Sequence, residues 1–428
     1  MPFADRPAVR AAALWLGFVA VHLWLSVAVL TGPHTPLNDV STVYRDWIAA
    51  GTAGSGWVGL QHVWVYPTVA LLPMLLAAAF GIAHYSATWL LLVAVLDALA
   101  LALLTRGGTR TLAVGWWWLA FLLLLGPIAV GRIDSITIPL ALAGMLALSR
   151  RPVLAGILLA LATWIKVWPA ALLLAVLIAS KRRIAAAAGA LGTSVVVVLA
   201  ALAVGGTWRV ITGFVGQQTG RGLQLEAPVT TFWLWLEAVG ASGVSTAFDR
   251  RLLTYQVSGP GTATTAALMT PVMAVVLLGV VAAGAWATRR GASALELLAP
   301  LSLALTTAFI VTNKVGSPQY EGWLAVPVIL GLVLAREGGR SFAVPAILTG
   351  LIAALTQVIY PWGYDALVLA ERWMVLVITA RNGLLAALLA VAVAGVVRAG
   401  RDAAPGVAGS SHDRRLQPVA QRGSSRGE

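Results

Sequence analysis

The chain has no cysteine and little charge. Of its 428 residues none is Cys, and Asp, Glu, Lys and Arg together make up only 11%, where soluble domains carry about 25%. The lack of cysteine excludes disulfides, thiolate metal sites and cysteine nucleophiles. The five histidines have no metal-ligand spacing. Phosphate loops, dinucleotide fingerprints, EF-hand loops and serine-nucleophile elbows are also missing. We therefore expect neither a metal nor a cofactor.

Apolar residues dominate the chain from end to end. They make up 59% of the sequence, and the mean hydropathy is +0.87. Apolar runs of about 20 residues recur, and at 1.5 Å per residue such a run crosses a ~30 Å bilayer core. The sequence thus predicts an all-α polytopic membrane protein with about 11 transmembrane helices, plus re-entrant or juxtamembrane helices. The net charge of +13 does not indicate nucleic-acid binding, because the basic residues cluster in short turns between apolar runs.

These basic turns orient the chain, because short loops rich in Lys and Arg stay in the cytoplasm. The turns are Arg6/Arg10, Arg106/Arg110, Arg150/Arg151, Lys181 to Arg183, Arg289/Arg290, Arg336/Arg340 and the region from Arg398. Tracing the chain through them puts both termini in the cytoplasm. It predicts a single plasma-membrane domain over residues 1–398 and a disordered cytoplasmic tail over residues 399–428.

Two long loops then lie outside the cytoplasm, at residues 31–66 and 205–265. The segment Pro152 to Ser180 has basic turns at both ends, and its halves are too short to cross the bilayer. It is expected to form a re-entrant hairpin with Trp164 to Pro169 at its outer tip. A short helix from Pro67 to Phe80 is expected to start and end on the outer side.

The same tracing sends most of the other polar motifs to the outer face. They combine carboxylates with single cations, each at the end of a different span. The members are Asp39, Asp46, Arg132, Asp134, Lys166, Arg221, Glu226, Lys314, Gln319 and Tyr320.

Such a set suits transfer of a sugar from phosphate. A glycosidase needs two carboxylates because its leaving alkoxide must be protonated. A phosphate instead leaves as a stable anion, so a single carboxylate suffices as base while cations receive the developing charge. Nucleotide sugars are scarce outside the cytoplasm. The pattern therefore favours a lipid-linked sugar phosphate as donor.

Six weak motifs in sequence carry a resemblance to a known family. They are the loop carboxylate after the first span, Trp64 to Pro67, Gly131 to Asp134, Thr163 to Pro169, Arg221 to Glu226, and Asn313 to Tyr320. Over roughly Leu14 to Gly395 the chain resembles glycosyltransferase family 87. The resemblance implies the GT-C membrane fold and an inverting, polyprenyl-phosphate-mannose-dependent α-1,2-mannosyltransferase that acts on the outer face of the plasma membrane. It also implies a lipid or lipoglycan acceptor of the cell envelope.

The resemblance makes a first-loop aspartate the catalytic base, and here that residue is Asp39. The loop also holds Asp46, which is the alternative base, although pairing with Arg45 is the simpler role for it. Asp39 could instead cap the helix expected over Ser41 to Ala50.

The other members of the set are predicted to bind substrate. They are Arg132, Asp134, Lys166, Arg221, Glu226, Lys314, Gln319 and Tyr320. Simpler roles stay open for several of them. Lys166 could be an interfacial anchor, Asp134 could cap the following helix, and Glu226 could pair with Arg221 or touch a sugar hydroxyl.

Two rival functions fit the same composition. A secondary transporter of an anionic solute would need pseudo-symmetric halves and coupling acids at mid-membrane. Asp97 is an acid inside a span, but no partner cation is evident for it and no repeat is visible. A flippase or polymerase of lipid-linked sugars would share the substrates and differ only in its products.

Overall fold

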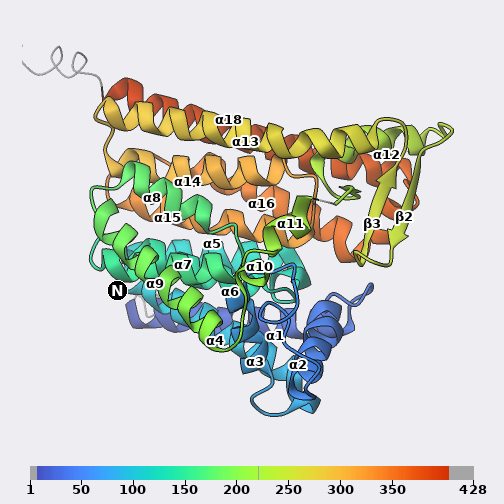
Figure 1. Ribbon diagram of the computed structural model, residues 1–428. Coiled ribbons are helices and arrows are strands. Elements are labelled where there is room, and N and C mark those ends of the chain that lie inside the picture. The colour runs from blue at the N-terminus through green and yellow to red at the C-terminus, as the bar shows by residue number, and fades with distance from the viewer. Residues whose placement is uncertain (1–6, 220, 404–428) are drawn as a thin grey trace, which may run out of the picture.

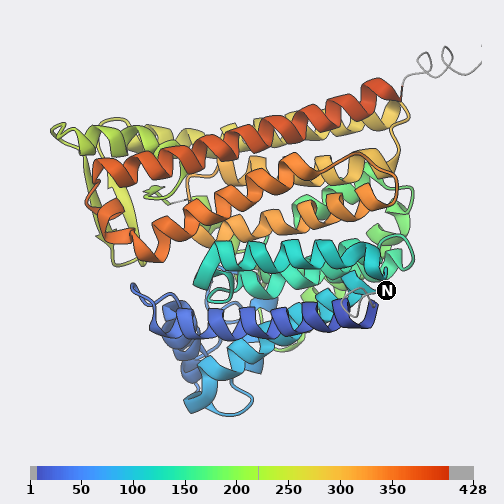
Figure 2. The same cartoon turned by 180° about the vertical axis from the view of Figure 1, so that it is seen from behind.

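The computed structural model describes residues 7–219 and 221–403 as a bundle of roughly parallel helices (Figure 1). The start of α1 (Pro7–Thr31) and the end of α18 (Arg372–Asp402) lie at one end of this bundle. A small sheet and α12 (Thr231–Ala238) lie at the other end, as the reverse view also shows (Figure 2). We call these two ends the terminal end and the sheet end.

Nine helical segments within the described residues are long and apolar enough to cross a membrane. They are α1, Ile82–Thr105 with α4 (Tyr85–Thr105), Thr111–Ala129 with most of α5 (Thr109–Leu125), α9 (Arg183–Ala203), α13 (Thr262–Arg289), α14 (Ala294–Val311), Pro318–Arg336 with α15 (Ala325–Arg336), Ala343–Trp362 with α16 (Ala343–Gln357), and α18. The chain is thus built as a polytopic membrane protein.

Four further apolar helical segments are shorter. They are Thr68–Ala77 with α3 (Leu71–Ala77), α6 (Asp134–Ala147), α7 (Pro152–Ile165) and α8 (Ala170–Ala179). The sequence-based count of about eleven crossings included α6 and treated α7 with α8 as one hairpin. That count stays a prediction. The expected disordered tail falls largely at residues 404–428, outside the described residues, and α18 continues to Asp402.

The chain breaks between α7 and α8 where the sequence indicated. Lys166 is extended, with φ −149° and ψ 135°, and Pro169 precedes the first residue of α8. Beyond α8, glycines let α9 pack tightly on α7. A Cβ atom at Gly156 would lie 1.9 Å from the backbone oxygen of Ala186, and one at Gly189 would lie 2.2 Å from that of Val153. Small residues thus bring the two backbones together.

The segment 205–265 contains a sheet that an all-α fold does not include. Three antiparallel strands lie in the order β1 (Leu223–Gln224), β3 (Thr254–Ser258), β2 (Ser245–Asp249). Two short helices, α10 (Trp208–Ile211) and α11 (Phe214–Thr219), come before them. Leu223 and Val257 face each other across β1 and β3, and both belong to a buried apolar cluster that includes Ile378 of α18. The sheet is therefore anchored on the bundle.

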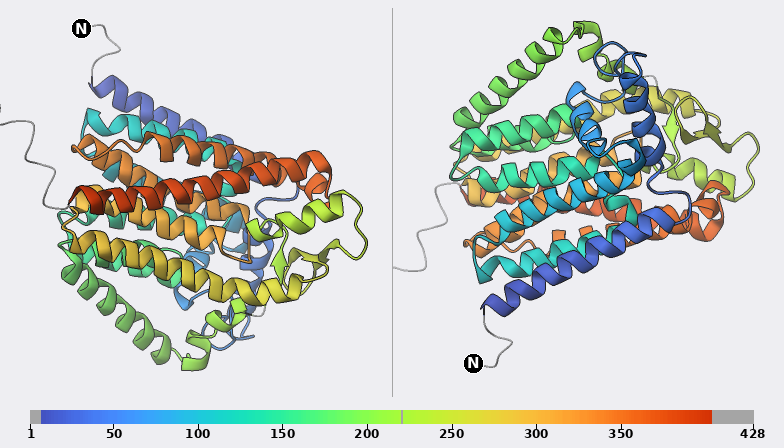
Figure 3. Two further views of the ribbon diagram at one scale, coloured as in Figure 1. Left: turned by 90° about the horizontal axis from the view of Figure 1, so that it is seen from above. Right: turned by 90° about the horizontal axis from the view of Figure 1, so that it is seen from below.

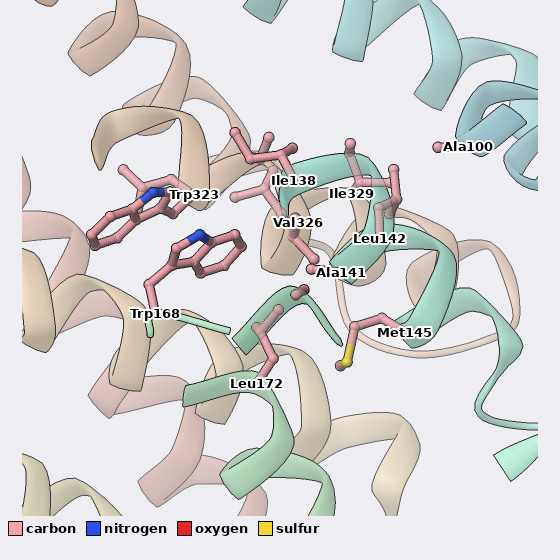
Figure 4. Packing of buried hydrophobic residues seen from close by; sticks show 14 of the residues in the cluster. Ala100, Ile138, Ala141, Leu142, Met145, Trp168, Leu172, Trp323, Val326 and Ile329 are labelled. Carbon is pink, nitrogen blue, oxygen red and sulfur yellow. The ribbon is translucent and has the colours of Figure 1, made fainter. Parts of the chain in front are cut away.

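The main core reaches up to the sheet end of the bundle. The indole rings of Trp168 and Trp323 stack with centroids 5.4 Å apart and an angle of 6° (Figure 4). Trp323 belongs to η7 (Pro318–Leu324), and the Trp168 indole donates a hydrogen bond to Thr137 Oγ1 over 2.9 Å. This packing joins the ends of α6, α8 and α15 beneath the polar residues described next.

Candidate functional site

Asp39 forms an ion pair with an arginine from another part of the chain. Its Oδ2 lies 3.2 Å from Arg132 Nε. Asp39 opens η2 (Asp39–Tyr44), which continues into α2 (Arg45–Thr52), whereas Arg132 follows η5 (Gly126–Ala129) just before α6. Arg132 is largely buried, but the Asp39 side chain is 34% exposed. The Asp39 carboxylate is thus held in place from one side and reached by solvent from another.

A glycine brings the two loops of this ion pair together. A Cβ atom at Gly131 would lie 2.7 Å from the backbone oxygen of Pro36. Arg132 donates to that same oxygen, and also to Tyr360 Oη over 3.4 Å. The guanidinium is therefore fixed by the loop that carries Asp39. The alternative role of Asp39 as a helix cap is not seen, because its carboxylate faces Arg132.

Asp46 has the simpler role expected for it. Its Oδ1 lies 3.3 Å from an Nη atom of Arg45, the preceding residue, and its side chain is 61% exposed. No cation from another helix contacts Asp46 among the described residues. The geometry therefore favours Asp39 over Asp46 as the acid of this site.

Lys166 and Asp134 form a second ion pair, with 3.4 Å between Nζ and Oδ2. The other carboxylate oxygen of Asp134 accepts a 2.7 Å hydrogen bond from the Trp323 indole. Both oxygens of this buried carboxylate thus have partners, so Asp134 positions Lys166. Burial lowers the pKa of Lys166, but Asp134, Tyr66 and Tyr320 raise it more, so its pKa is raised overall. Lys166 is thus a largely buried cation with a fixed partner, which does not fit a snorkelling anchor.

Phenol side chains connect the two ion pairs. Tyr66 lies under Lys166, with 5.0 Å from its ring centroid to Nζ, and its hydroxyl lies 3.3 Å from that of Tyr44. The Tyr44 hydroxyl accepts a 3.4 Å hydrogen bond from the backbone N–H of Ile133, next to Arg132. Burial raises the pKa of both phenols. They therefore stay neutral hydrogen-bonding groups between two cations.

A third charged cluster joins Glu226 to two residues absent from the sequence-based set, Arg381 of α18 and Glu321. One Nη atom lies 3.3 Å from Glu226 Oε2 and 3.9 Å from Glu321 Oε1, and the other donates to the backbone oxygen of Glu226 over 2.6 Å. All three side chains are almost fully buried. Of the two roles left open for Glu226, pairing with Arg221 is not seen, because its carboxylate pairs with Arg381. An arginine inside an apolar run is costly unless it is paired, and that signal could have revealed Arg381.

Burial also changes the titration of this cluster. It raises the pKa of Glu226 to about 7, although Arg381 and, more weakly, Arg132 lower it. One arginine faces two carboxylates, so the charge of this buried cluster is balanced when the two carboxylates hold one proton between them.

The two remaining predicted motifs lie against each other. The backbone oxygen of Lys314 accepts a 3.0 Å hydrogen bond from the N–H of Gln224 in β1. A Cβ atom at Gly316 would lie 2.2 Å from the backbone nitrogen of Ala227, so only glycine fits there. The segment after α14 thus packs directly on the segment that carries Arg221 and Glu226. Burial lowers the pKa of Lys314.

Other predicted residues divide between the site and its surroundings. Tyr320 stacks on Trp323 at 4.2 Å and lies 5.6 Å from Lys166 Nζ, so it belongs with the Lys166 pair. Gln319 lines a small cavity together with Asp134. The Nε atom of Arg221 is buried and lacks a partner within the described residues. No hydrogen bond or ion pair in that part of the chain joins Arg221 to Asp39 or Lys166.

Asp97 has a partner that the sequence did not reveal. Its Oδ2 lies 3.1 Å from His22 Nε2, and both side chains are buried between α4 and α1. This is a polar contact between two spans, separate from the site. No group of three or more His, Cys, Asp or Glu side chains within residues 7–219 and 221–403 could hold a metal ion.

The long apolar helices define a polytopic membrane protein. Its candidate site is a set of ion pairs and aromatic side chains gathered towards the sheet end of the bundle. The family model of glycosyltransferase family 87 matches residues 64–313, more than half of the chain. The chain belongs to this family, which implies glycosyltransferase activity. Comparisons with curated proteins and with solved structures gave no match.

The matched range contains part of the predicted site. Arg132, Asp134, Lys166, Arg221 and Glu226 lie inside it. The remaining members, Asp39, Lys314, Gln319 and Tyr320, lie outside it. The family membership alone therefore assigns no role to Asp39, and its case rests on the geometry described above.

Proposed function

We propose that this protein is an inverting glycosyltransferase that moves a hexose, mannose by resemblance, from a polyprenyl-phosphate donor to a lipid or lipoglycan acceptor. The observation that carries the proposal is the Asp39–Arg132 pair. It offers one solvent-reached carboxylate beside a largely buried guanidinium, with 3.2 Å between the nearest atoms. A single base with adjacent cations is what displacement of a phosphate requires.

The reaction follows as a single displacement. Asp39 accepts the proton of an acceptor hydroxyl while that oxygen bonds to the anomeric carbon of the donor sugar. The bond between this carbon and the phosphate oxygen breaks, and polyprenyl phosphate leaves with the electron pair. Attack from the face opposite to the phosphate inverts the anomeric centre. A leaving phosphate needs no protonation, so the reaction has no use for a second acid.

Lys166 and Arg132 are proposed to receive the charge of the phosphate. Lys166 lies at the break between α7 and α8, where a phosphate at the membrane surface would meet it. Asp134 and two aromatic rings hold its ammonium group in place before substrate arrives. Such preorganised charge costs little reorganisation during the reaction. Arg221 and Lys314 are proposed to bind further oxygens of donor or acceptor.

The proposed location is the extracytoplasmic face of the plasma membrane. The terminal end of the bundle carries the start of α1 and the end of α18. It also carries Arg340, which pairs with Glu296 over 2.7 Å and contacts Asp402. Basic turns favour the cytoplasmic side. If the terminal end is cytoplasmic, the site at the sheet end faces outward.

Substitution of the two loop acids tests the proposal. Membranes containing the Asp39→Asn variant are supplied with polyprenyl-phosphate-mannose, and transfer of mannose to lipid acceptors is measured. Loss of the base should reduce the rate by about 10²- to 10⁴-fold. Asp46→Asn is the matched control and should transfer at the wild-type rate. Transfer by Asp39→Asn at the wild-type rate would overturn the assignment. A wild-type product that retains the donor's anomeric configuration would overturn the single displacement.

A further inference from the structure

Four aromatic rings form a continuous line from the β2–β3 hairpin to Arg132. Phe248 and Tyr255 face each other across the hairpin with ring centroids 5.2 Å apart. Tyr255 lies 5.8 Å from Tyr364, and Tyr364 lies 5.1 Å from Tyr360. The Tyr360 hydroxyl accepts the 3.4 Å hydrogen bond from Arg132. We call these four rings the aromatic line.

The aromatic line runs from solvent to the Asp39 pair. Phe248 is 48% exposed, Tyr255 and Tyr364 are half-buried, and Tyr360 is buried. The hairpin of β2 and β3, which carries Phe248 and Tyr255, lies at the sheet end of the bundle (Figure 3). The rings meet edge to face, in the T-shaped arrangement that aromatic side chains prefer. A ligand lying along them would be guided to the carboxylate of Asp39.

Polar groups accompany these rings. The hydroxyls of Tyr255 and Tyr364 make no hydrogen bond within the described part of the chain, and neither is sealed from solvent. His34 Nε2 lies 3.4 Å from Asp365 Oδ2, and the His34 ring lies 5.5 Å from that of Tyr364. The Asp365 side chain is 83% exposed. The line therefore offers donors and acceptors beside apolar ring surfaces.

This combination matches the surface of a sugar. A hexose presents C–H groups on the faces of its ring and hydroxyls around its edge. Aromatic side chains contact such C–H faces, while phenol, imidazole and carboxylate groups bond to the hydroxyls. A lipid chain would use the rings alone and leave the polar groups without partners.

A second group of aromatic rings, which begins at Lys166, has different chemistry. Tyr66 lies 5.0 Å from Lys166 Nζ, its hydroxyl lies 3.3 Å from that of Tyr44, and the ring of Trp47 lies 5.8 Å from that of Tyr44. A fixed cation beside these rings suits the phosphate of the donor. The outer part of the aromatic line instead has an exposed acid beside it in Asp365, which would repel a phosphate. The cation that the line meets, Arg132, lies at its inner end beside Asp39. The rings next to Lys166 and the outer part of the aromatic line are thus suited to different substrates.

We propose that the aromatic line binds the carbohydrate part of the acceptor and directs its hydroxyl to Asp39, while the Lys166 side receives the donor. The inference rests on the proposed glycosyl transfer and adds to it the residues that hold the sugars of the acceptor. An acceptor with two sugars would extend outward along Tyr364 and Tyr255 and would gain contacts that a single sugar does not make.

Two synthetic acceptors test this assignment with polyprenyl-phosphate-mannose as donor. The KM of the wild-type protein should be lower for octyl dimannoside than for octyl mannoside. Tyr255→Ala and Phe248→Ala should remove that preference by raising the KM for the dimannoside by about 3- to 10-fold, the loss of one aromatic contact. The KM for the donor should not change. Tyr255→Phe keeps the ring and should retain most of the preference.

Phe232→Ala is the matched control. Phe232 is an exposed aromatic residue of α12 that lies outside the aromatic line, and its loss should leave both acceptor KM values unchanged. A dimannoside preference that survives in Tyr255→Ala and Phe248→Ala would overturn the inference, as would a wild-type protein with no preference.

A measurement of oligosaccharide binding tests the aromatic line independently of the proposed transfer reaction. Mannotriose binding to detergent-solubilised protein is measured by saturation-transfer NMR, without any donor. A wild-type protein that transfers no sugar but binds mannotriose through Tyr255 would overturn the proposed function and support the aromatic line. Binding that Tyr255→Ala and Phe248→Ala leave unchanged would overturn the aromatic line, whatever the transfer rate.

Discussion

At the scale of single residues, the candidate site is built from ion pairs whose two partners come from distant segments of the chain. Arg381 contacts Glu226, which follows β1, and Glu321, which belongs to η7. One carboxylate oxygen of Glu321 is buried without a hydrogen-bond partner in the described residues. A buried pair of acids with a single cation is costly unless a proton is shared. The protonation of this cluster, and with it the stability of the segment that carries Glu226, therefore depends on pH.

The raised pKa of Glu226 gives a pH dependence with a defined sign. Its pKa is about 7 in the folded protein, against an ordinary value of 4.5. Between these values the folded state binds more protons than the unfolded state, so stability falls as pH rises. The thermal midpoint in detergent should therefore decrease from pH 5 to pH 7.5 by a few degrees, and Glu226→Gln should flatten this slope.

Glu296→Gln provides the comparison for this measurement. Glu296 pairs with Arg340 at the terminal end and is far more exposed than Glu226. Its substitution should leave the slope as it is in the wild type. A slope that persists in Glu226→Gln would show that another group carries the pH dependence.

The Asp39–Arg132 pair could be predicted only in part. The first-loop acid and the cation were both visible as polar residues at the ends of apolar runs. That Arg132 lies against Asp39 could not be seen, because the contact depends on Gly131 approaching Pro36 across 95 residues of chain. Similarly, Glu226 was identified, but its partner Arg381 is 155 residues away.

At the scale of elements, the helices could be predicted from the apolar composition of the sequence, whereas the sheet could not. Long apolar runs indicate helices because the bilayer leaves few other ways to satisfy backbone groups. The strands β1, β2 and β3 have two to five residues each and lack clean alternation. Short strands carry little periodic signal. The break at Lys166 could be predicted because two short apolar halves met at a Trp-Pro dipeptide.

The contact between α7 and α9 gives a prediction at this scale. Gly189 lies against the backbone of Val153, so a larger side chain would force the two helices apart. Gly189→Val should lower the free energy of unfolding by about 1–3 kcal/mol, the usual range for overpacking. Thermal unfolding in detergent measures this loss. Gly192→Val is the matched control, since a Cβ atom there meets nothing within 4 Å. Equal stability of the two variants would contradict the close packing.

At the scale of the whole molecule, the arrangement separates two kinds of charge. The terminal end carries exposed basic turns, whereas the sheet end has buried ion pairs with aromatic rings in addition to exposed charges such as Asp365. The positive-inside rule applies only to the exposed basic turns. The tracing from basic turns brought together residues that the fold also brings together, such as Lys166, Asp134 and Tyr320. Which of these residues form ion pairs depends on how the helices pack, and the positions of basic turns do not predict that packing.

The absence of native cysteine makes the orientation directly measurable. Ser55 lies in an exposed turn after α2, and Ser341 is exposed in the turn that carries Arg340. Single variants Ser55→Cys and Ser341→Cys each introduce one thiol into a chain with no other. A membrane-impermeant maleimide should label Ser55→Cys in intact cells, while Ser341→Cys should react only after permeabilisation. The cysteine-free chain is its own control for background labelling. The reverse pattern would place the Asp39 pair in the cytoplasm, where nucleotide sugars are available, and would remove the reason for a lipid-linked donor.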